Sequence, residues 1–147
     1  MERLAIRIRR LRPGAQLPAK ASPDAAGADL CACLEDDLAI GPGETALVPT
    51  GLAAEIPAGY AGFVFARSGL ASRGGLAPAN KVGVIDADYR GELLVALHNH
   101  GKKSAVVEPG QRVAQLVILP VPAADYIEAE ALSQTERGAG GFGSTGK

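Results

Sequence analysis

Two carboxylates, a tyrosine and an arginine lie within five residues of one another near the middle of the chain, in the segment Asp86-Ala87-Asp88-Tyr89-Arg90. A turn needs only one glycine or Asx residue, so this concentration of polar groups indicates a site. A carboxylate at the tip of such a turn can orient and activate a water molecule as a general base. The alternative interpretation is a turn that is simply solvated.

The residues on either side of this segment predict the element that positions it. Val82, Val84 and Ile85 are β-formers, and the apolar run Leu93–Leu97 follows the polar residues. Two apolar runs separated by turn residues are typical of a hairpin. We therefore expect residues 80–92 to form a hairpin with its polar groups at the tip.

Three further stretches carry groups that bind anions or metals. Arg67, Ser68 and Gly69 offer a guanidinium, a hydroxyl and backbone amides at a possible helix start, which suits an anion, although a surface turn is the alternative. Strand alternation predicts that Gln111, Val113 and Gln115 share a face, where a glutamine can donate to phosphate. Asp29 lies near a glycine, and this signal is weak alone.

The last fifteen residues, Ser133–Lys147, differ in kind from the rest. They hold five glycines, no aliphatic residue larger than alanine and one aromatic residue, Phe142. Such a segment cannot bury enough surface to order itself, so we expect a folded domain over residues 1–132 and a flexible tail over 133–147. The tail fits two phosphate-binding glycine patterns, but both require a strand and a following helix. Its amides, with Arg137 and the hydroxyls of Ser144 and Thr145, can still wrap a phosphate.

Composition limits the class of protein. The chain has 147 residues, with 47% hydrophobic residues, 19 Gly, 10 Pro and no Trp, which favours one turn-rich β domain. A net charge of −1 gives no electrostatic reason to bind nucleic acid. The basic start alternates with Leu4, Ile6 and Ile8 as a strand does, so we expect no targeting segment, no membrane association and a cytoplasmic location.

The cysteines and histidines do not predict a metal site. Cys31 and Cys33 have no second pair, so we expect reduced, buried thiols. His98 and His100 are interpreted as ordinary strand or turn residues.

Short strands separated by turn residues recur along the whole chain. This pattern predicts an all-β, antiparallel sandwich or barrel. One helical turn is expected over Arg67–Arg73. The predicted strands are Leu4–Leu11, Ala28–Leu34, Thr45–Val48, Gly51–Ile56, Tyr60–Phe65, Leu93–Leu97, Ala105–Val107 and Gln111–Leu119.

Taken together, five stretches resemble, in order, the five motifs of the trimeric dUTPases. The resemblance runs from residue 26 to residue 146, and only Ala28 and Ala66 depart from common family residues. The five stretches are Ala-Gly-Ala-Asp-Leu (26–30), Arg-Ser-Gly-Leu-Ala (67–71), Gly-Val-Ile-Asp-Ala-Asp-Tyr-Arg-Gly-Glu (83–92), Gly-Gln-Arg-Val-Ala-Gln-Leu (110–116) and Arg-Gly-Ala-Gly-Gly-Phe-Gly-Ser-Thr-Gly (137–146).

The resemblance implies a jelly-roll-like fold and a homotrimer whose active sites are shared by three subunits. It also implies hydrolysis of dUTP to dUMP and pyrophosphate with Mg²⁺, which keeps uracil out of DNA and supplies dUMP for dTMP synthesis. The metal is expected to be held mainly by the triphosphate oxygens.

The same resemblance implies a role for each matching residue. Asp86 activates the attacking water, Tyr89 packs under the deoxyribose, and Asn80 and the backbone of Gly83, Val84 and Ile85 read the uracil. Asp29 lies near the metal and acts through water. The remaining substrate contacts are Arg67, Ser68, Gly69 and Gln115 for phosphates, Arg137, Ser144 and Thr145 for the γ-phosphate, and Phe142 with Gly143 for the lid.

Two rival functions fit the same fold. A dCTP deaminase carries a glutamate on the strand after the motif, at the position that aligns with Ala96 here, and lacks the tail. A non-catalytic nucleotide-binding trimer is expected to have lost Asp86 or the lid.

Overall fold

The computed structural model describes residues 4–142, and almost all of the regular structure in that range is β-strand. The elements are β1 (Arg7–Arg10), β2 (Ala28–Cys31), β3 (Leu38–Ile40), β4 (Thr45–Glu55), β5 (Tyr60–Phe65), α1 (Ser68–Gly74), β6 (Leu76–Pro78), β7 (Gly83–Ile85), β8 (Glu92–Asn99), β9 (Ala105–Val107) and β10 (Arg112–Pro120).

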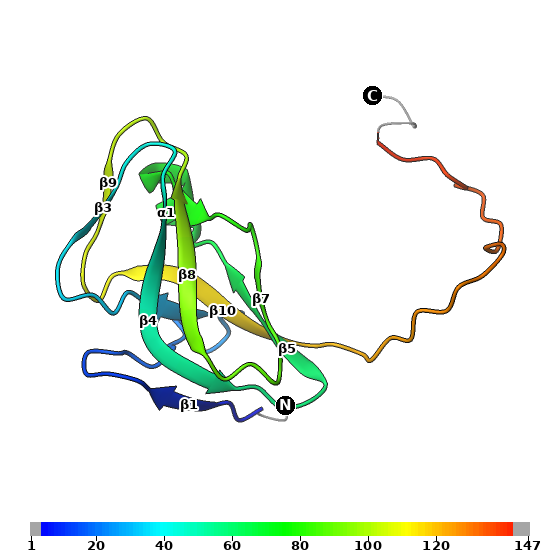
Figure 1. The fold of residues 1–147 in the computed structure, drawn as a ribbon, viewed down its shortest axis with the longest axis horizontal. Coiled ribbons are helices and arrows are strands. Elements are labelled where there is room, and N and C mark those ends of the chain that lie inside the picture. Colours follow the sequence, from blue (N-terminus) through cyan, green and yellow to red (C-terminus); the bar gives the residue numbers. More distant parts are fainter. Residues whose placement is uncertain (1–3, 143–147) are drawn as a thin grey trace.

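The strands form two four-stranded sheets and one small sheet (Figure 1). The first sheet has the order β1-β4-β8-β6, the second has the order β2-β10-β5-β7, and β3 pairs with β9. Every pairing is antiparallel. The predicted all-β antiparallel fold is therefore confirmed.

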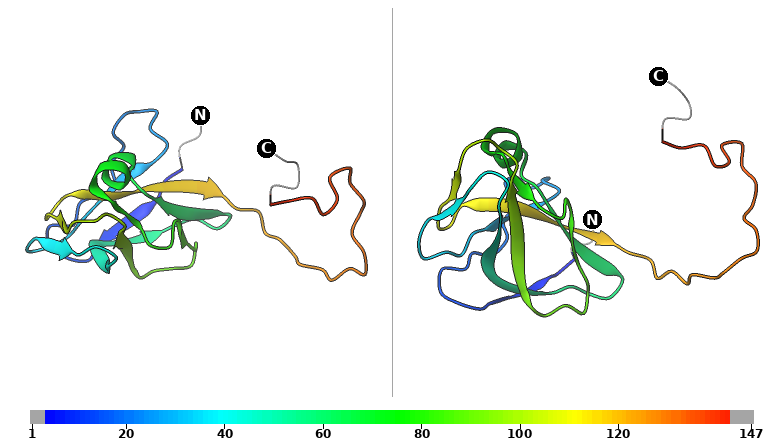
Figure 2. Two further views of the ribbon diagram at one scale, coloured as in Figure 1. Left: turned by 90° about the horizontal axis from the view of Figure 1, so that it is seen from above. Right: turned by 45° about the horizontal axis from the view of Figure 1, so that its top comes forward.

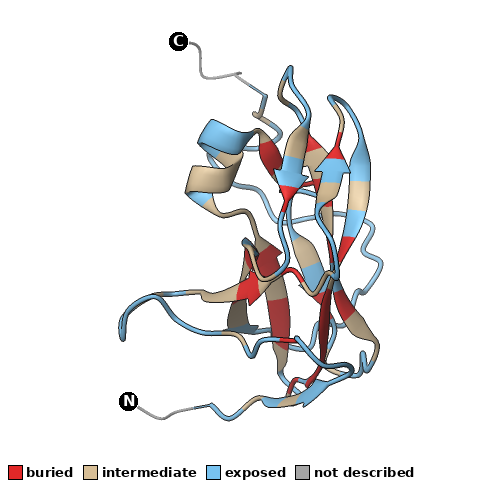
Figure 3. Ribbon diagram, turned by 90° about the vertical axis from the view of Figure 1, so that its left-hand side faces the viewer, coloured by how far each residue is buried: buried red, intermediate tan, exposed pale blue. Residues whose placement is uncertain are grey.

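One hydrophobic core joins the three sheets, and buried residues lie along the strands in the interior of the molecule (Figure 3). Strand β8 shows the cause, since Leu93, Val95 and Leu97 are buried while Leu94 between them is 46% exposed. This alternation is what a strand with one core-facing side requires. Each fully buried aliphatic side chain contributes about 1.5–3 kcal/mol, so the core holds both sheets in place.

The short helix α1 follows β5 and confirms the helical turn predicted there. Arg67 precedes it in an extended conformation (φ −88°, ψ 125°). Gly75 ends it at φ 70°, and its N–H donates to the Leu70 carbonyl. A left-handed residue after the last turn is the usual role of glycine at a helix end. The helix therefore fixes the position of Arg67 between the end of β5 and the start of α1.

The predicted hairpin over residues 80–92 is wrong. Strand β7 pairs with β5, whereas β8 pairs with β4 and β6, so the two strands belong to different sheets. The connection spans residues 86–91, which is longer than the usual two to five residues of a hairpin loop. Ile85 is buried through pairing with β5 instead. The polar segment therefore crosses from one sheet to the other.

The sequence predicted two separate strands on either side of Pro49, and this prediction is wrong. A single strand runs from Thr45 to Glu55, with a register shift between Pro49 and Ala53. At this bulge Gly51 adopts φ 69°, and the Thr50 hydroxyl donates to the Leu93 carbonyl at 2.6 Å. Because the bulge interrupts the regular hydrogen bonding at this point, the strand can contain a proline and still continue. The three-residue strands β3 and β6 were missed because they are too short to show alternation.

Residues 121–142 follow β10 without forming a helix or strand, and Figures 1 and 2 show this segment leading away from the sheets. Of the residues described, none belongs to a helix with the length and apolar character that crossing a membrane requires. Cys31 and Cys33 are free thiols and are half-buried, so the prediction of buried thiols is wrong in degree. Strand β2 ends at Cys31, before the predicted Leu34.

Candidate functional site

A cavity of about 310 Å³ lies beside β7 and the connection that follows it. It gathers every residue that the sequence predicted to bind the nucleoside. Its walls also contain Leu47 of β4 and residues 92–96 at the start of β8. The predicted residues in its lining are Asn80, Gly83, Val84, Ile85, Asp86 and Tyr89.

Strand β7 lies at the edge of its sheet, because β5 is its only partner among the described strands. Its second edge therefore offers backbone N–H and C=O groups to the cavity. A Cβ on Gly83 would lie 3.3 Å from Val64 Cβ and 3.4 Å from Asn80 Nδ2. Glycine at this position keeps the Asn80 amide close to the strand.

The turn after β7 is held by contacts within itself. Tyr89 N–H donates to the Asp86 carbonyl at 3.1 Å, and Arg90 Nη1 donates to the Ala87 carbonyl at 2.6 Å. The Asp86 side chain is exposed and lines the cavity. This geometry presents a solvated carboxylate from a closed turn, which suits a group that orients water.

The Tyr89 ring is fixed at its hydroxyl end. Its O–H donates to the Glu92 carbonyl at 2.9 Å, and the residue is 45% exposed at the cavity. An exposed aromatic ring with a fixed polar end is suited to packing against a ligand.

A second group, here called the arginine cluster, consists of Asp29, Arg67, Arg112 and Gln115. Arg67 Nε donates to Asp29 Oδ1 at 2.8 Å, and Arg112 Nη1 donates to Asp29 Oδ2 at 3.2 Å. Gln115 pairs with Asp29 on one side and with Phe65 on the other. Sheet register therefore brings together residues that are 86 positions apart in the chain (29 and 115).

The predicted shared face of Gln111, Val113 and Gln115 is wrong, because a bulge shifts the register between Arg112 and Ala114. Val113 and Ala114 are consequently both fully buried. Gln115 is half-buried, and its Nε2 donates to the Ala66 carbonyl at 2.9 Å. This contact still places Gln115 beside Arg67.

Burial and the neighbouring Asp29 carboxylate raise the pKa of the Cys31 thiol above its usual value. Both effects disfavour a thiolate, and the nearby Arg112 and Arg67 oppose them only in part. The raised pKa disfavours the reactive thiolate of Cys31 beside the arginine cluster.

One chain does not unite all of the predicted site residues. Arg67, Gly69 and Arg112 line a separate depression of about 450 Å³, which shares no lining residue with the cavity at β7. Ser68 is exposed at the start of α1.

The tail residues lie apart from both places. The segment that holds Arg137 and Phe142, orange to red in Figure 1, leads away from the sheets. Arg137 Nε donates to the Gly140 carbonyl at 2.8 Å, and Phe142 is fully exposed. Gly143, Ser144 and Thr145 lie outside the described residues.

Sequence reasoning missed three residues that the structure places at these sites. Arg112 holds Asp29, and its position two residues after Gly110 in the fourth motif was the available signal. Gly91 and Glu92 contact Tyr89, and the sequence assigned neither residue a role in the site. Their position directly after Tyr89-Arg90 gave no sign of contact with the ring.

The donor set suits a magnesium ion bound mainly by a nucleotide. Among residues 4–142 the structure brings no three His, Cys, Asp or Glu side chains together. Asp29 uses both oxygens for guanidinium groups but keeps lone pairs that can accept water. Mg²⁺ in phosphate sites usually has few protein ligands and retains several waters, which this arrangement fits.

Comparison with known proteins agrees with the geometry. The family model described as dUTPase matches residues 14–146. The deoxyuridine 5'-triphosphate nucleotidohydrolase of Desulfitobacterium hafniense is 58% identical over 132 residues, which cover 89% of this chain and 87% of the relative. The enzyme of the same name from Syntrophotalea carbinolica is 50% identical over 146 residues, 99% of each chain.

A solved structure matches over the same length. A mutant dUTPase of Staphylococcus bacteriophage 80alpha with dUpNHpp superposes with a TM-score of 0.89 at 28% identity, covering 97% of this chain and 99% of that one. A family-model match over nearly the whole length, two close relatives and a common fold all point to one conclusion: this chain belongs to the dUTPase family.

Proposed function

We propose that this chain hydrolyses dUTP to dUMP and pyrophosphate, as the names of its relatives state for them. The observation that carries the proposal is the cavity at β7, where Asn80, the β7 backbone, Asp86 and Tyr89 share one wall. These groups are the ones needed to hold a base and a sugar beside a water-activating carboxylate.

The edge of β7 reads the base in this proposal. A strand edge alternates N–H and C=O groups, which complement the acceptor-donor-acceptor edge of uracil, and Asn80 adds a side-chain amide. Cytosine would leave buried groups unpaired, at a cost of about 1–3 kcal/mol per group. Specificity for uracil therefore needs no charged side chain.

Tyr89 and Asp86 act on the sugar and the water. The Tyr89 ring packs under the deoxyribose and leaves no room for a 2′-hydroxyl. Asp86 orients a water molecule in line with the α-phosphorus and accepts its proton, while donors around the phosphates stabilise the charge. The closed turn supports this role because it fixes both residues relative to β7.

The arginine cluster contacts the phosphates. Arg67 follows the end of β5, and Gln115, within β10, donates to the neighbouring Ala66 carbonyl; Ser68 and Gly69 follow Arg67 directly. A guanidinium held by a carboxylate offers its remaining N–H groups to phosphate oxygens in a fixed orientation. When bound, Mg²⁺ would neutralise the triphosphate, with Asp29 holding one of its water ligands.

The separation of these groups supports a homotrimer with shared sites. The cavity at β7 and the depression at Arg67 do not meet in one chain, and the tail leads away from both. Exposed Leu47, Val84 and Leu94 around the cavity support a neighbouring subunit there. In the trimer, Arg137, Phe142, Gly143, Ser144 and Thr145 of a third subunit close the site and exclude bulk water.

Deamination of dCTP fits the cavity poorly. Ala96, at the position where deaminases carry a glutamate, lines the cavity with a methyl group only. The other cavity carboxylate besides Asp86 belongs to Glu92, which is bound to the Gly51 amide and to Arg12. It is therefore not available for attack on a base.

The decisive experiment measures pyrophosphate release from dUTP, dCTP, dTTP and UTP with Mg²⁺, side by side, together with ammonia release from dCTP. We expect rapid release from dUTP alone. Equal rates with dUTP and dTTP, or ammonia from dCTP, would refute the proposal.

A further inference from the structure

The Tyr89 ring is held by the two residues that follow Arg90. Its hydroxyl donates to the Glu92 carbonyl at 2.9 Å. A Cβ built on Gly91 would lie 2.5 Å from Tyr89 Cζ and 2.9 Å from Cε2, closer than any real Cβ contact. The hydroxyl end of the ring therefore lies directly against Gly91, and with a larger residue at this position the Tyr89 side chain or its surroundings must shift.

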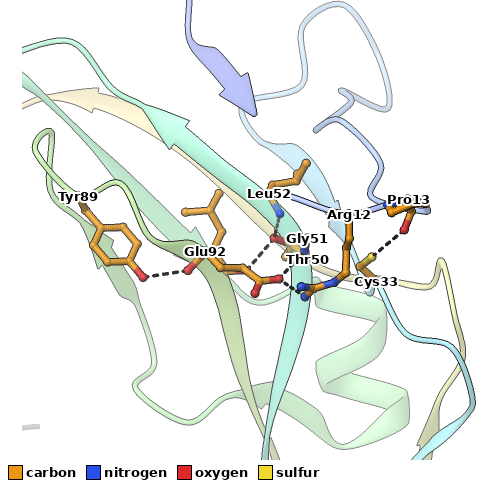
Figure 4. Close-up of polar contacts among 9 residues, drawn as sticks. Arg12, Pro13, Cys33, Thr50, Gly51, Leu52, Tyr89 and Glu92 are labelled. Atoms are coloured by element: carbon orange, nitrogen blue, oxygen red, sulfur yellow. Dashed lines mark hydrogen bonds and ion pairs between the residues drawn. The ribbon is translucent and has the colours of Figure 1, made fainter. Parts of the chain in front are cut away.

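The Glu92 side chain is itself anchored to the neighbouring strand β4 and to Arg12, which follows β1 (Figure 4). Its Oε1 accepts from the Gly51 N–H at 2.7 Å and pairs with the Arg12 guanidinium. The Glu92 side chain is only 21% exposed. Because the bulge in β4 breaks the ladder between Pro49 and Ala53, the Gly51 amide is free to bind this carboxylate.

The residue after Glu92 is fixed by the same bulge. The buried Thr50 hydroxyl donates to the Leu93 carbonyl at 2.6 Å and accepts from the Leu52 N–H at 3.3 Å. Figure 4 shows Glu92 lying between Tyr89 and Arg12. The carbonyl that receives the Tyr89 hydroxyl is therefore held by both the side chain of Glu92 and the backbone beyond it.

We propose that Gly91 and Glu92 are positioning residues that hold the Tyr89 ring where it excludes a ribose 2′-hydroxyl, with Arg12 and the β4 bulge as their anchor. The proposal rests on the proposed function and adds how the sugar is selected. The Tyr89 ring can exclude a 2′-hydroxyl only if the ring keeps its position. Because the residue is 45% exposed, its side chain can change rotamer unless contacts hold it. The structure supplies a close contact at Gly91 for the hydroxyl end of the ring and an acceptor for the hydroxyl itself.

The test compares kcat/KM for dUTP and UTP in the full-length chain. We expect Gly91→Ala and Glu92→Ala each to lower the dUTP/UTP ratio about tenfold, by admitting UTP and misplacing dUTP. Glu92→Gln keeps an acceptor for the Gly51 amide, so it should recover most of the ratio. Arg12→Gln changes an exposed anchor without risk to folding and should lower the ratio in the same direction by a smaller factor.

Two comparisons separate positioning from general stability. Glu55→Gln removes an exposed carboxylate of β4 that pairs with Arg7 at 3.3 Å, and it should leave the ratio unchanged. Combining Tyr89→Phe with Glu92→Ala should lower the dUTP/UTP ratio no further than Glu92→Ala alone. Both substitutions disturb the same contact, the hydrogen bond from the Tyr89 hydroxyl to residue 92.

The outcomes are distinct. Failure of the wild-type chain to hydrolyse dUTP overturns the proposed function itself. Normal wild-type hydrolysis with an unchanged ratio in Gly91→Ala and Arg12→Gln, even where Tm falls, overturns the positioning role alone.

Discussion

Arg67 and Asp29 form an ion pair at the end of β5, with Arg67 Nε donating to Asp29 Oδ1 at 2.8 Å. The second oxygen of the same carboxylate pairs with Arg112 Nη1 at 3.2 Å. The carboxylate is only 15% exposed, while the two guanidinium groups are 28% and 55% exposed. One partly buried anion thus holds two cations that line the depression proposed to bind the phosphates.

Asp29→Asn should therefore weaken phosphate binding more than it weakens the fold. The amide keeps one acceptor but loses the charge that holds both guanidiniums, so we expect a higher KM for dUTP and a loss of about 1–2 kcal/mol of stability. If Asp29 also holds a magnesium-bound water, the Mg²⁺ concentration for half-maximal rate should rise. Steady-state kinetics over a range of Mg²⁺ and thermal unfolding measure these effects.

Glu55→Gln is the matched control for Asp29→Asn. Its pair with Arg7 is exposed on both sides (46% and 83%), and such pairs contribute about 0–1 kcal/mol. Neither KM nor the Mg²⁺ dependence should change. An unaltered KM in Asp29→Asn would show that the ion pair does not orient Arg67 for substrate.

Asp86→Asn tests the proposed general base. The side chain is exposed and makes no side-chain contact on which the turn depends, so the variant should fold and bind nucleotide normally. We expect kcat to fall about 10²–10⁴-fold at nearly constant KM. Asp88→Asn, an exposed carboxylate of the same turn outside the cavity lining, is the control. Near wild-type turnover in Asp86→Asn would assign the base elsewhere.

Truncation after Ser133 tests the lid. Residues 134–142 belong to the segment that leads away from the sheets, so the truncation should not affect the core or the number of subunits measured by light scattering. We expect kcat for dUTP to fall about a hundredfold, comparable to the loss of one preorganised donor. Arg137→Ala and Phe142→Ala in the full-length chain should each reproduce part of this loss. An unaffected rate in the truncated chain would mean that the tail plays no part in catalysis.

Cys31 provides a pH-dependent test of the environment beside the arginine cluster. Burial, and then Asp29, raise the pKa of its thiol, so less thiolate is present in the folded chain than in the unfolded chain at the same pH. In a Cys33→Ser background, alkylation of Cys31 should reach half its maximal rate at a higher pH in the native chain than in urea. Stability should correspondingly fall as pH rises past the unfolded pKa, since only the unfolded thiol then ionises. Coincident midpoints would contradict the predicted environment.

The sequence alone predicted most of the strands, from runs of β-forming residues bounded by turn residues. Tyr60–Phe65 and Ala105–Val107 were placed at their observed bounds, and the strand at 92–99 was found with slightly short ends. The sequence did not predict that β7 and β8 belong to different sheets, because strand pairing depends on which strands meet in space. Nor did the sequence predict the bulges at Gly51 and Val113, because the register shift at a bulge depends on how the partner strand pairs with it.

The same division applies to the site. Five ordered motifs determined by themselves the family and the identities of the candidate groups, because chemistry requires particular side chains at particular spacings. Only the tertiary structure decided that Asp29 holds Arg67 and Arg112, that Gly91 lies against the hydroxyl end of Tyr89, and that the cavity at β7 and the depression at Arg67 are separate in one chain. Contacts such as these depend on sheet register and on the path between sheets, which arise from packing the whole chain around one core.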